Sequence, residues 1–322
     1  MHVIADSLLR GGPGQSLLPS ALAGRLSLVT VGVFDGIHLG HQHLIAQLIK
    51  LARQRGWLAG VITFYPHPAA VLTPHESPLY LTTPGEKVLL LDRLGVDWTA
   101  ILAFNPQMAV LSPTDFMLRL YHQLGMRGLC ASDDFALGHH RSGDLLTLQA
   151  LGQKIGFEVY VVPPLNISSG RVSSSRIRAC LKEGDVETAA YLLGRPYRLA
   201  GEVVHGAKRG RRMGFPTANL AVNSDRVVPG NGVYATWAYL GDERYLSVTN
   251  VGTRPSFDNG VRSIEVHLLE FSDDIYGYDL ALEFVARLRS EARFADLQTL
   301  IAQIAQDVMA ARQILSAGQN EV

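Results

Sequence analysis

The chain has 322 residues, of which 47% are hydrophobic and 18% charged, so it is long and apolar enough for two folded domains. Lys and Arg together number 29, as do Asp and Glu, and this zero net charge argues against nucleic acid as the main partner. We expect neither a signal peptide nor a membrane partner, because no suitable apolar run occurs. Cys130 and Cys180 lie among apolar neighbours, which favours reduced thiols of a cytoplasmic protein over a disulfide or metal pair.

The first half of the chain alternates apolar runs with helical patterns. The runs expected to form strands are Leu26–Val31, Leu58–Phe64, Trp98–Phe104, Gly128–Ala131 and Phe157–Val162. A capping box begins a helix at Thr83, and Ser112 followed by proline begins another. This alternation predicts a parallel sheet wrapped by helices, with ligands bound beyond the carboxyl ends of the strands.

The stretch from Gly32 to His41 follows the first of these runs, and we expect it to bind phosphate. His38 and His41 are three residues apart at the start of a predicted helix, so they share one face. The free N–H groups of a first helical turn favour an anion, and three glycines let a ligand approach the backbone. Histidines at a helix start are also common as caps. The whole string, however, resembles the nucleotidyltransferase superfamily, in which two imidazoles stabilise charge on the transferred phosphate.

Three further segments of the first half are candidates for ligand contacts. Phe64 and His67, in a loop fixed by prolines, either contact a ring or a phosphate or form only a rigid turn. Asp134 and its acidic neighbour either accept hydrogen bonds from a nucleoside or belong to a solvated loop. The run Val172–Arg178 places serines and two arginines at a helix start, which predicts a second anion site, although serines are also ordinary caps there.

The second half, after Arg195 and Pro196, shows short strand-like runs separated by turns. These runs are Leu199–His205, Gly232–Leu240, Tyr245–Asn250, Ser263–Phe271 and Leu280–Leu288. They predict a small antiparallel β-barrel. A final helix is expected over residues 294–315, with an apolar stripe of Phe294, Leu297, Leu300, Ile301, Ile304, Val308 and Ile314. We place the domain boundary so that the domains are residues 1–186 and 187–322.

Two features of the second half predict a phosphate and metal site. A basic loop with several glycines, residues 208–219, ends in Pro-Thr-Ala-Asn, where Thr217 and Asn219 offer neutral oxygens on one side of an extended segment. Such oxygens suit Mg²⁺ bound with nucleotide phosphates, although a basic loop is also typical of a solvated hairpin. In the alternating run 264–268, Glu265 and His267 share one face. Glu265 is then either a general base for phosphoryl transfer or a solvent-facing side chain.

These motifs resemble, over nearly the whole chain, the prokaryotic bifunctional riboflavin kinase/FMN adenylyltransferase family. The segments that carry the resemblance include Gly32–His41, Thr63–Pro68, Ser173–Arg178, Gly214–Asn219 and Glu265–His267. It implies an α/β fold with an N-terminal Rossmann-like, parallel-sheet nucleotidyltransferase domain, followed by a small antiparallel β-barrel domain with a C-terminal helix. It also implies two reactions. The barrel domain phosphorylates riboflavin to FMN with ATP, and the first domain adenylylates FMN to FAD with release of pyrophosphate.

The resemblance further implies a role for each site residue. Catalytic roles fall to His38, His41 and Glu265, and Mg²⁺ binding to Thr217 and Asn219. Nucleotide binding falls to Gly32, Phe34, Asp35, Gly40, Asp134, Ser174, Ser175, Arg178, Gly210, Gly214 and Pro216, and flavin binding to Phe64, His67, Pro68 and Arg289. Tyr65, Ser132 and the pair His139-His140 depart from the residues common in the family. The implied partners are the substrates ATP, riboflavin and FMN, and the oligomeric state stays open, a weak homo-oligomer included.

Two other functions fit parts of the chain. The first domain alone would suit an adenylyl- or cytidylyltransferase for another phosphate such as phosphopantetheine, but the segment Pro216–Asn219 argues against this. A flavin-binding regulator would keep the fold without turnover. Such a protein would be expected to lack the phosphate-site residues, which are present here.

Overall fold

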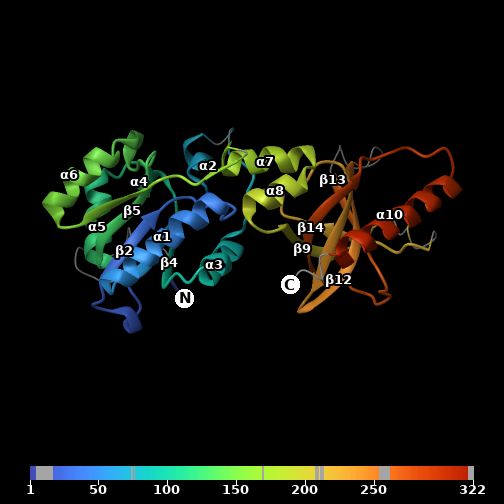
Figure 1. Cartoon of the computed structure of the whole chain (residues 1–322), viewed down its shortest axis with the longest axis horizontal. Coiled ribbons are helices and arrows are strands. Elements are labelled where there is room, and N and C mark those ends of the chain that lie inside the picture. Colours follow the sequence, from blue (N-terminus) through green and yellow to red (C-terminus); the bar gives the residue numbers. More distant parts are fainter. Residues whose placement is uncertain are drawn as a thin grey trace. The chain divides into compact units, whose positions relative to one another are not determined.

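The computed structural model describes residues 1–4, 17–73, 75, 77–168, 170–206, 210, 214–253 and 262–317. The chain forms two compact units, Met1–Ser173 and Ser174–Val322. Figure 1 draws the first unit from blue to green and the second from yellow to red.

A six-stranded sheet forms the centre of the first unit, and each neighbouring pair of strands is parallel. Its order is β1 (His2–Ile4), β4 (Trp98–Leu102), β3 (Leu58–Phe64), β2 (Ser27–Val31), β5 (Met126–Ser132) and β6 (Glu158–Val162). The predicted parallel sheet is therefore confirmed. The sequence does not predict β1, because a strand of three residues is too short to show a periodic pattern.

Helices cover both faces of this sheet. On one face α1 (Leu39–Arg55) and α3 (Pro84–Arg93) bury Ile45, Leu48 and Leu91. On the other face α5 (Pro113–Gln123) and α6 (Leu145–Ile155) bury residues that include Phe116, Leu120 and Leu148. The short helices α2 (Pro68–Leu72) and α4 (Pro106–Ala109) follow β3 and β4. A small hairpin of β7 (Asn166–Ile167) and β8 (Gly170–Arg171) ends the unit.

Local capping signals set the helix starts where the sequence predicts them. The hydroxyl of Thr83 accepts the N–H of Glu86, and the Glu86 carboxylate accepts the N–H of Thr83, which completes the capping box of α3. The Ser112 hydroxyl likewise caps α5 by accepting the N–H of Asp115. These two helix starts are thus fixed by local side chains.

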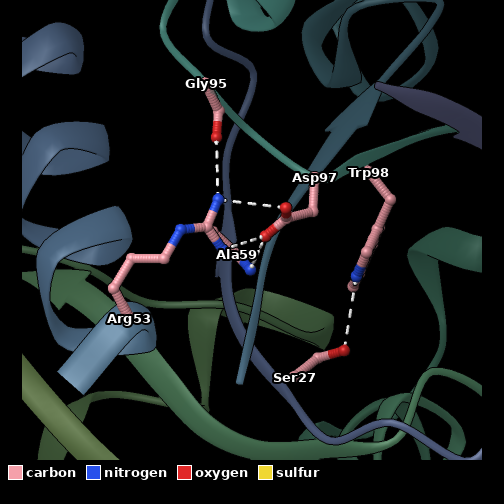
Figure 2. Close-up of polar contacts among 6 residues, drawn as sticks. All are labelled: Ser27, Arg53, Ala59, Gly95, Asp97 and Trp98. Atoms are coloured by element: carbon pink, nitrogen blue, oxygen red, sulfur yellow. Dashed lines mark hydrogen bonds and ion pairs between the residues drawn. The ribbon is translucent and has the colours of Figure 1, made fainter. Parts of the chain in front are cut away.

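An ion pair joins α1 to the segment before β4 (Figure 2). Arg53 donates to the two carboxylate oxygens of Asp97 at 2.6 and 3.0 Å and to the Gly95 carbonyl at 3.4 Å. Asp97 also accepts the backbone N–H of Ala59 at 2.7 Å. These bonds lower the pKa of Asp97 against the opposing effect of its burial. They fix α1 relative to β3 and β4, at the end of the helix away from the histidines.

Trp98 packs closely against a neighbouring strand of this sheet. Its ring is fully buried, and its indole N–H donates to the Ser27 hydroxyl at 3.3 Å (Figure 2). A Cβ atom at Gly60 would lie 2.1 Å from the indole ring. Only glycine therefore leaves room for Trp98 between neighbouring strands.

The second unit contains a closed antiparallel barrel, which confirms the predicted architecture. Its strand order is β10 (Ala218–Ala221), β13 (Arg262–Leu268), β12 (Glu243–Thr253), β11 (Gly232–Leu240), β14 (Asp279–Arg289) and β9 (Tyr197–Val204). The strand-like runs of the sequence do not include β10. Its first two residues, Ala218 and Asn219, belong to the predicted metal loop, and its four residues carry little apolar pattern of their own.

Two helices precede the barrel and pack on it within the same unit. They are α7 (Ser174–Glu183) and α8 (Val186–Leu193). Arg287 of β14 donates through its side chain to the Glu183 carbonyl at 3.0 Å and through its backbone to the Glu187 carboxylate at 2.8 Å. The compact unit thus begins at Ser174, while the functional boundary between residues 186 and 187 stays a prediction.

The C-terminal helix differs in part from its predicted stripe. It is α10 (Leu297–Ala317), and Ala311 and Leu315 pack with barrel residues while Val308 lies against the same cluster. Leu297 and Ile314, both in the predicted stripe, are exposed. The stripe is wrong at these two positions, because the buried face follows positions 308, 311 and 315. Among the described residues, no helix has the length and apolar character needed to cross a membrane.

Candidate functional sites

The turn between β2 and α1 has an unusual backbone that its neighbours hold in place. Phe34 and Ile37 have φ values of 49° and 41°, a region that costs a non-glycine residue about 1–2 kcal/mol. The Asp35 carboxylate, only 2% exposed, accepts the backbone N–H groups of Leu81 and Thr82 at 3.1 Å. Asp35 and Phe34, both predicted to bind nucleotide, are thus buried, and the contacts of Asp35 shape the turn.

The two imidazoles of this turn lie together, as the sequence predicts. His38 caps α1, because its Nδ1 accepts the backbone N–H of His41 at 3.3 Å. In neutral His38 the proton therefore lies on Nε2. The two rings stack with centroids 3.6 Å apart and planes 15° from parallel. A Cβ atom at Gly40 would lie 3.2 Å from Cε1 of His38, so glycine keeps this side of the ring open.

His41 has the chemistry of a neutral hydrogen-bonding group. Its Nδ1 atom is buried and has no hydrogen-bond partner among the described residues. Burial, the neighbouring His38 and the ammonium of Lys87, in that order, hold the pKa of His41 well below its usual range. The stacked pair at a helix start is therefore suited to meet an anion with neutral N–H donors.

An apolar pocket of about 530 Å³ opens after β3 and β4 in the first unit. Phe64 and Phe104 contribute to its wall and meet edge to face, with ring centroids 5.7 Å apart. The short helix η3 (His139–Arg141), which contains the unusual histidine pair, also lines it. Phe104 is a lining residue that the sequence gives only as a strand end. The pocket has the size and apolar character of a site for a flat ring system.

His67 and Pro68, also predicted to bind flavin, form the start of α2. The His67 Nδ1 accepts the N–H of Ala69 at 3.1 Å, and the His67 N–H donates to the Tyr80 hydroxyl at 2.7 Å. The pocket wall includes Val71 and Leu72 of the same helix. His67 and Pro68 therefore position α2 next to the pocket, and a direct flavin contact stays a prediction.

Asp134 lies after β5 in a small polar cluster. It accepts a hydrogen bond from the Ser132 hydroxyl at 2.8 Å and forms an ion pair with Arg171 of β8. The Ser132 hydrogen bond is the largest cause that lowers the pKa of Asp134, and the bond and charge of Arg171 act in the same direction. Ser132, a departure from the common family residue, thus helps to hold the carboxylate ionised.

Ser174, Ser175 and Arg178 lie in the first turns of α7, which confirms the predicted helix start. Because α7 belongs to the second compact unit, its position relative to His38 and His41 is not described. Their common role in one nucleotide site therefore stays a prediction.

A second pocket, of about 290 Å³, lies at one end of the barrel. Its lining includes Pro216 and Thr217 together with Asp273 and Asp274. The Pro216 carbonyl lies 2.7 Å from Nδ1 of His267, which fixes the loop before β10 to β13. Pro216 and Thr217, two of the site residues predicted in this loop, therefore border a cavity.

Glu265 lies between two asparagines on the barrel sheet. It is opposite Asn219 of β10 on one side and opposite Asn250 of β12 on the other. Directly opposite residues share a face of the sheet, so a carboxylate and two amides gather there. Ile264 and Val266 are buried, which confirms the predicted alternation. A Cβ atom at Gly206 would lie 2.0 Å from the Asn219 amide, so glycine gives that side chain room.

The predicted basic loop lies largely outside the described residues. Gly210 and Gly214 are described: a Cβ atom at Gly210 would lie 2.3 Å from the Phe215 carbonyl, and Gly214 has a φ of 83°. Both positions therefore favour glycine on backbone grounds. Their nucleotide contact stays a prediction.

Arg289, predicted to bind flavin, pairs with the C-terminal helix. Its guanidinium donates to both oxygens of Asp307, which is 4% exposed, at 2.9–3.1 Å. It also lies over the Phe294 ring, 5.5 Å from the centroid. This pairing fixes α10 to β14, and a role of Arg289 at the flavin stays a prediction.

Comparisons with known proteins place both units in one family. Residues 23–176 match the family described as FAD synthetase, and residues 193–315 match the riboflavin kinase family. The bifunctional riboflavin kinase/FMN adenylyltransferase of Bacillus subtilis is 39% identical over 87% of this chain and 90% of its own length. The Escherichia coli K12 protein of the same name is 36% identical over 89% and 92%.

A solved structure also resembles the whole chain. It is described as a macrolide-efflux protein from Streptococcus pneumoniae and is 30% identical, with a TM-score of 0.85 over 97% of this chain and 99% of its own. The relatives and both family matches agree with the division of the chain into a nucleotidyltransferase-type unit and a kinase-type unit. The chain therefore belongs to the family of bifunctional riboflavin kinase/FMN adenylyltransferases.

Proposed function

We propose that this chain makes flavin cofactors in two ATP-dependent steps, which its two units perform in turn. The barrel unit transfers the γ-phosphate of ATP to the 5′-hydroxyl of riboflavin and yields FMN. The first unit then joins FMN to the AMP part of a second ATP and yields FAD and pyrophosphate. One observation carries this proposal: the chain contains both sites. One unit holds the stacked imidazoles of His38 and His41, and the other holds Glu265 opposite Asn219.

In the kinase step Glu265 accepts the proton of the riboflavin hydroxyl. Its place opposite Asn219 and Asn250 supports this role, because neighbouring amides do not neutralise the charge of the carboxylate. The pocket beside Pro216 and Thr217 receives ATP phosphates. A positioned carboxylate of this kind contributes through orientation and general base catalysis.

The donors at this site fit Mg²⁺. Thr217 and Asn219 are alternate residues of an extended segment and offer neutral oxygens, which Mg²⁺ accepts when phosphates and water complete its ligands. No group of three or more His, Cys, Asp or Glu residues suited to a metal occurs in the described part of the chain. We therefore propose that Thr217 and Asn219 hold Mg²⁺ with the substrate phosphates. When bound, the ion would neutralise charge on the transferred group.

In the adenylyl transfer step an FMN phosphate oxygen attacks the α-phosphorus of ATP, and the bond to pyrophosphate breaks. Charge gathers on the transferred phosphate and on the leaving group, and His38 and His41 stabilise it with N–H donors. A Cβ atom at Gly32 would lie 3.0 Å from the Phe34 ring and one at Gly40 3.2 Å from the His38 ring, so glycine gives both rings room. We expect the phosphates to approach the backbone at these two glycines. Ser174, Ser175 and Arg178 bind nucleotide phosphates at the start of α7.

The apolar pocket after β3 and β4 takes the flavin ring of FMN. Phe64 and Phe104 offer a ring edge and face for stacking, which is worth about 0.5–1.5 kcal/mol beyond burial for such pairs. Asp134 contacts the nucleoside, and its ion pair with Arg171 keeps the carboxylate ionised as an acceptor.

The free thiols Cys130 and Cys180 support a cytoplasmic location.

The proposal is tested by incubating the purified protein with riboflavin, ATP and Mg²⁺ and separating the flavins by chromatography. FMN should appear first and FAD later. A protein that forms neither product would contradict the whole assignment.

The two steps should be separable by substitution in one unit at a time. The double variant His38→Ala/His41→Ala should lower FAD formation about 10²-fold or more while FMN accumulates. Loss of both products in this variant, with folding intact by circular dichroism, would show that the activities do not belong to separate units.

Glu265→Gln should have the opposite effect. It removes the proton acceptor but keeps the shape, so riboflavin phosphorylation should fall about 10²–10⁴-fold. Conversion of supplied FMN to FAD should stay at the rate of the unsubstituted enzyme. An unchanged kinase rate would exclude Glu265 as the base.

A further inference from the structure

A lysine is buried beneath the turn that carries the paired imidazoles. Lys87 of α3 is only 4% exposed. Its ammonium donates to the Val33 carbonyl at 2.7 Å and to the Thr63 hydroxyl at 3.1 Å. Thr63, which is fully buried, donates to the same carbonyl at 2.8 Å. Lysine is almost never fully buried without a specific partner, and the mechanism above does not use this one.

The carbonyl that Lys87 holds lies at the start of the strained backbone. Val33 directly precedes Phe34, the first residue of the turn with a positive φ. Such a conformation persists only where the surroundings determine it. Asp35 anchors the turn to the segment before α3, and Lys87 with Thr63 anchors it from the side of α3 and β3.

We propose that Lys87 is a positioning residue for adenylyl transfer, which holds the turn and its two imidazoles in place through the Val33 carbonyl and the Thr63 hydroxyl. The inference rests on the proposed function of His38 and His41. It assigns to Lys87 no contact with substrate. A misplacement of about 1 Å at a reacting group can cost about 10²-fold in rate, so a fixed turn matters for the chemistry.

Lys87 also acts on the charge of His41. Burial lowers the pKa of Lys87 to about 8, and the charge of Asp35 opposes this, so the ammonium is mostly charged at pH 7. This positive charge adds to the effects of burial and of His38 in lowering the pKa of His41. The charged and titratable groups that act on Lys87 and His41 come from the same turn: Asp35 acts on Lys87, and His38 acts on His41. Lys87 itself also acts on His41. His41 is thereby kept as a neutral donor beside the phosphate.

Two variants separate the position of the turn from its charge. Lys87→Met removes both the hydrogen bonds and the positive charge of the ammonium. Thr63→Val replaces the hydroxyl with a methyl group of similar size, and it leaves the charge of Lys87 in place. Lys154→Met, an exposed lysine of α6, is the matched control. We expect Lys87→Met to lower kcat for FMN adenylylation about tenfold or more, with KM for FMN changed less than about threefold. Riboflavin phosphorylation should be unchanged in all three variants.

A second measurement follows the imidazole directly. The titration of His41 is recorded by NMR on the full chain and assigned by its loss in His41→Gln. Its midpoint should move to higher pH in Lys87→Met and stay in place in Thr63→Val and Lys154→Met. Thr63→Val should still lower kcat, because the anchor of the Val33 carbonyl is weakened.

Two results would overturn the inference. One is a normal kcat for adenylylation in Lys87→Met. The other is a His41 titration that does not change in that variant, since it would leave Lys87 with an ordinary packing role. Failure of the proposed function would show differently, because the unsubstituted enzyme would then form no FAD from FMN.

Discussion

The buried ammonium of Lys87 should make the protein less stable than it would be with an apolar side chain at that position. Burial lowers the pKa of Lys87 from 10.5 to about 8, and this shift corresponds to about 3 kcal/mol of unfolding free energy lost at neutral pH. Lys87→Met removes this cost. It also removes the hydrogen bonds to Val33 and Thr63, worth about 1 kcal/mol each, so the net gain at pH 7 should be about 1–2 kcal/mol.

The pH dependence of this difference is the sharper part of the prediction. The folded protein releases the Lys87 proton near pH 8, whereas the unfolded chain releases it near 10.5. Between these values the unfolded state binds more protons, so the stability of the unsubstituted protein rises with pH relative to the variant. Below pH 8 the advantage of Lys87→Met is constant. From pH 7 to pH 9.5 that advantage should shrink by about 2 kcal/mol.

Urea unfolding at both pH values measures this change. A Trp237→Phe background leaves Trp57 and Trp98, both in the first unit, as the fluorescent reporters. Lys154→Met serves as the control, because this exposed side chain should give no pH-dependent difference. An advantage of Lys87→Met that is equal at pH 7 and pH 9.5 would refute the reasoning, since the ammonium would then carry no burial cost.

Two further substitutions test the packing of the first unit and its flavin pocket. Gly60→Ala places a Cβ atom 2.1 Å from the fully buried Trp98 ring, so it should lower the unfolding free energy by about 2–3 kcal/mol in the same urea assay. An unchanged midpoint would mean that the strands separate at little cost. Phe64→Ala should raise KM for FMN about tenfold, because it removes one aromatic wall of the pocket, and leave KM for riboflavin unchanged. Equal effects on both values would place Phe64 outside the flavin site.

The fold was predictable wherever local signals decide the structure. The run Leu58–Phe64 has the same bounds as β3, and Gly232–Leu240 the same bounds as β11, because each is a long run of apolar and β-branched residues. The capping box at Thr83 also forms as its residues indicate. The stripe of α10 was wrong at Ile314 because several faces of this helix are apolar, and only its docking on the barrel selects one of them.

Site residues were predictable from the sequence only where neighbouring residues in the chain form a recognisable motif with them. The spacing of His38 and His41 predicts that they lie on one face, and the structure places their rings together, with His38 as the N-cap of α1. Lys87 gave no such signal, and Asn250, although part of a motif that resembles the family, gave no indication that it lies beside Glu265. Lys87 is part of an ordinary capped helix, and Asn250 reaches Glu265 only through the pairing of β12 with β13. Contacts of this kind depend on tertiary register, which a single sequence does not display.

Zero net charge and two sites for triphosphates are compatible, because neither site depends on an excess of surface cations. At the first site the positive potential comes from a helix start and from the buried ammonium of Lys87, whose charge Asp35 partly balances. At the second site it would come from the Mg²⁺ that we propose Thr217 and Asn219 hold together with the substrate phosphates. Local sources of this type are screened less by salt than surface charges are. The zero net charge of the whole chain therefore argues against nucleic acid as the main partner, which stays a prediction, and it does not argue against nucleotides.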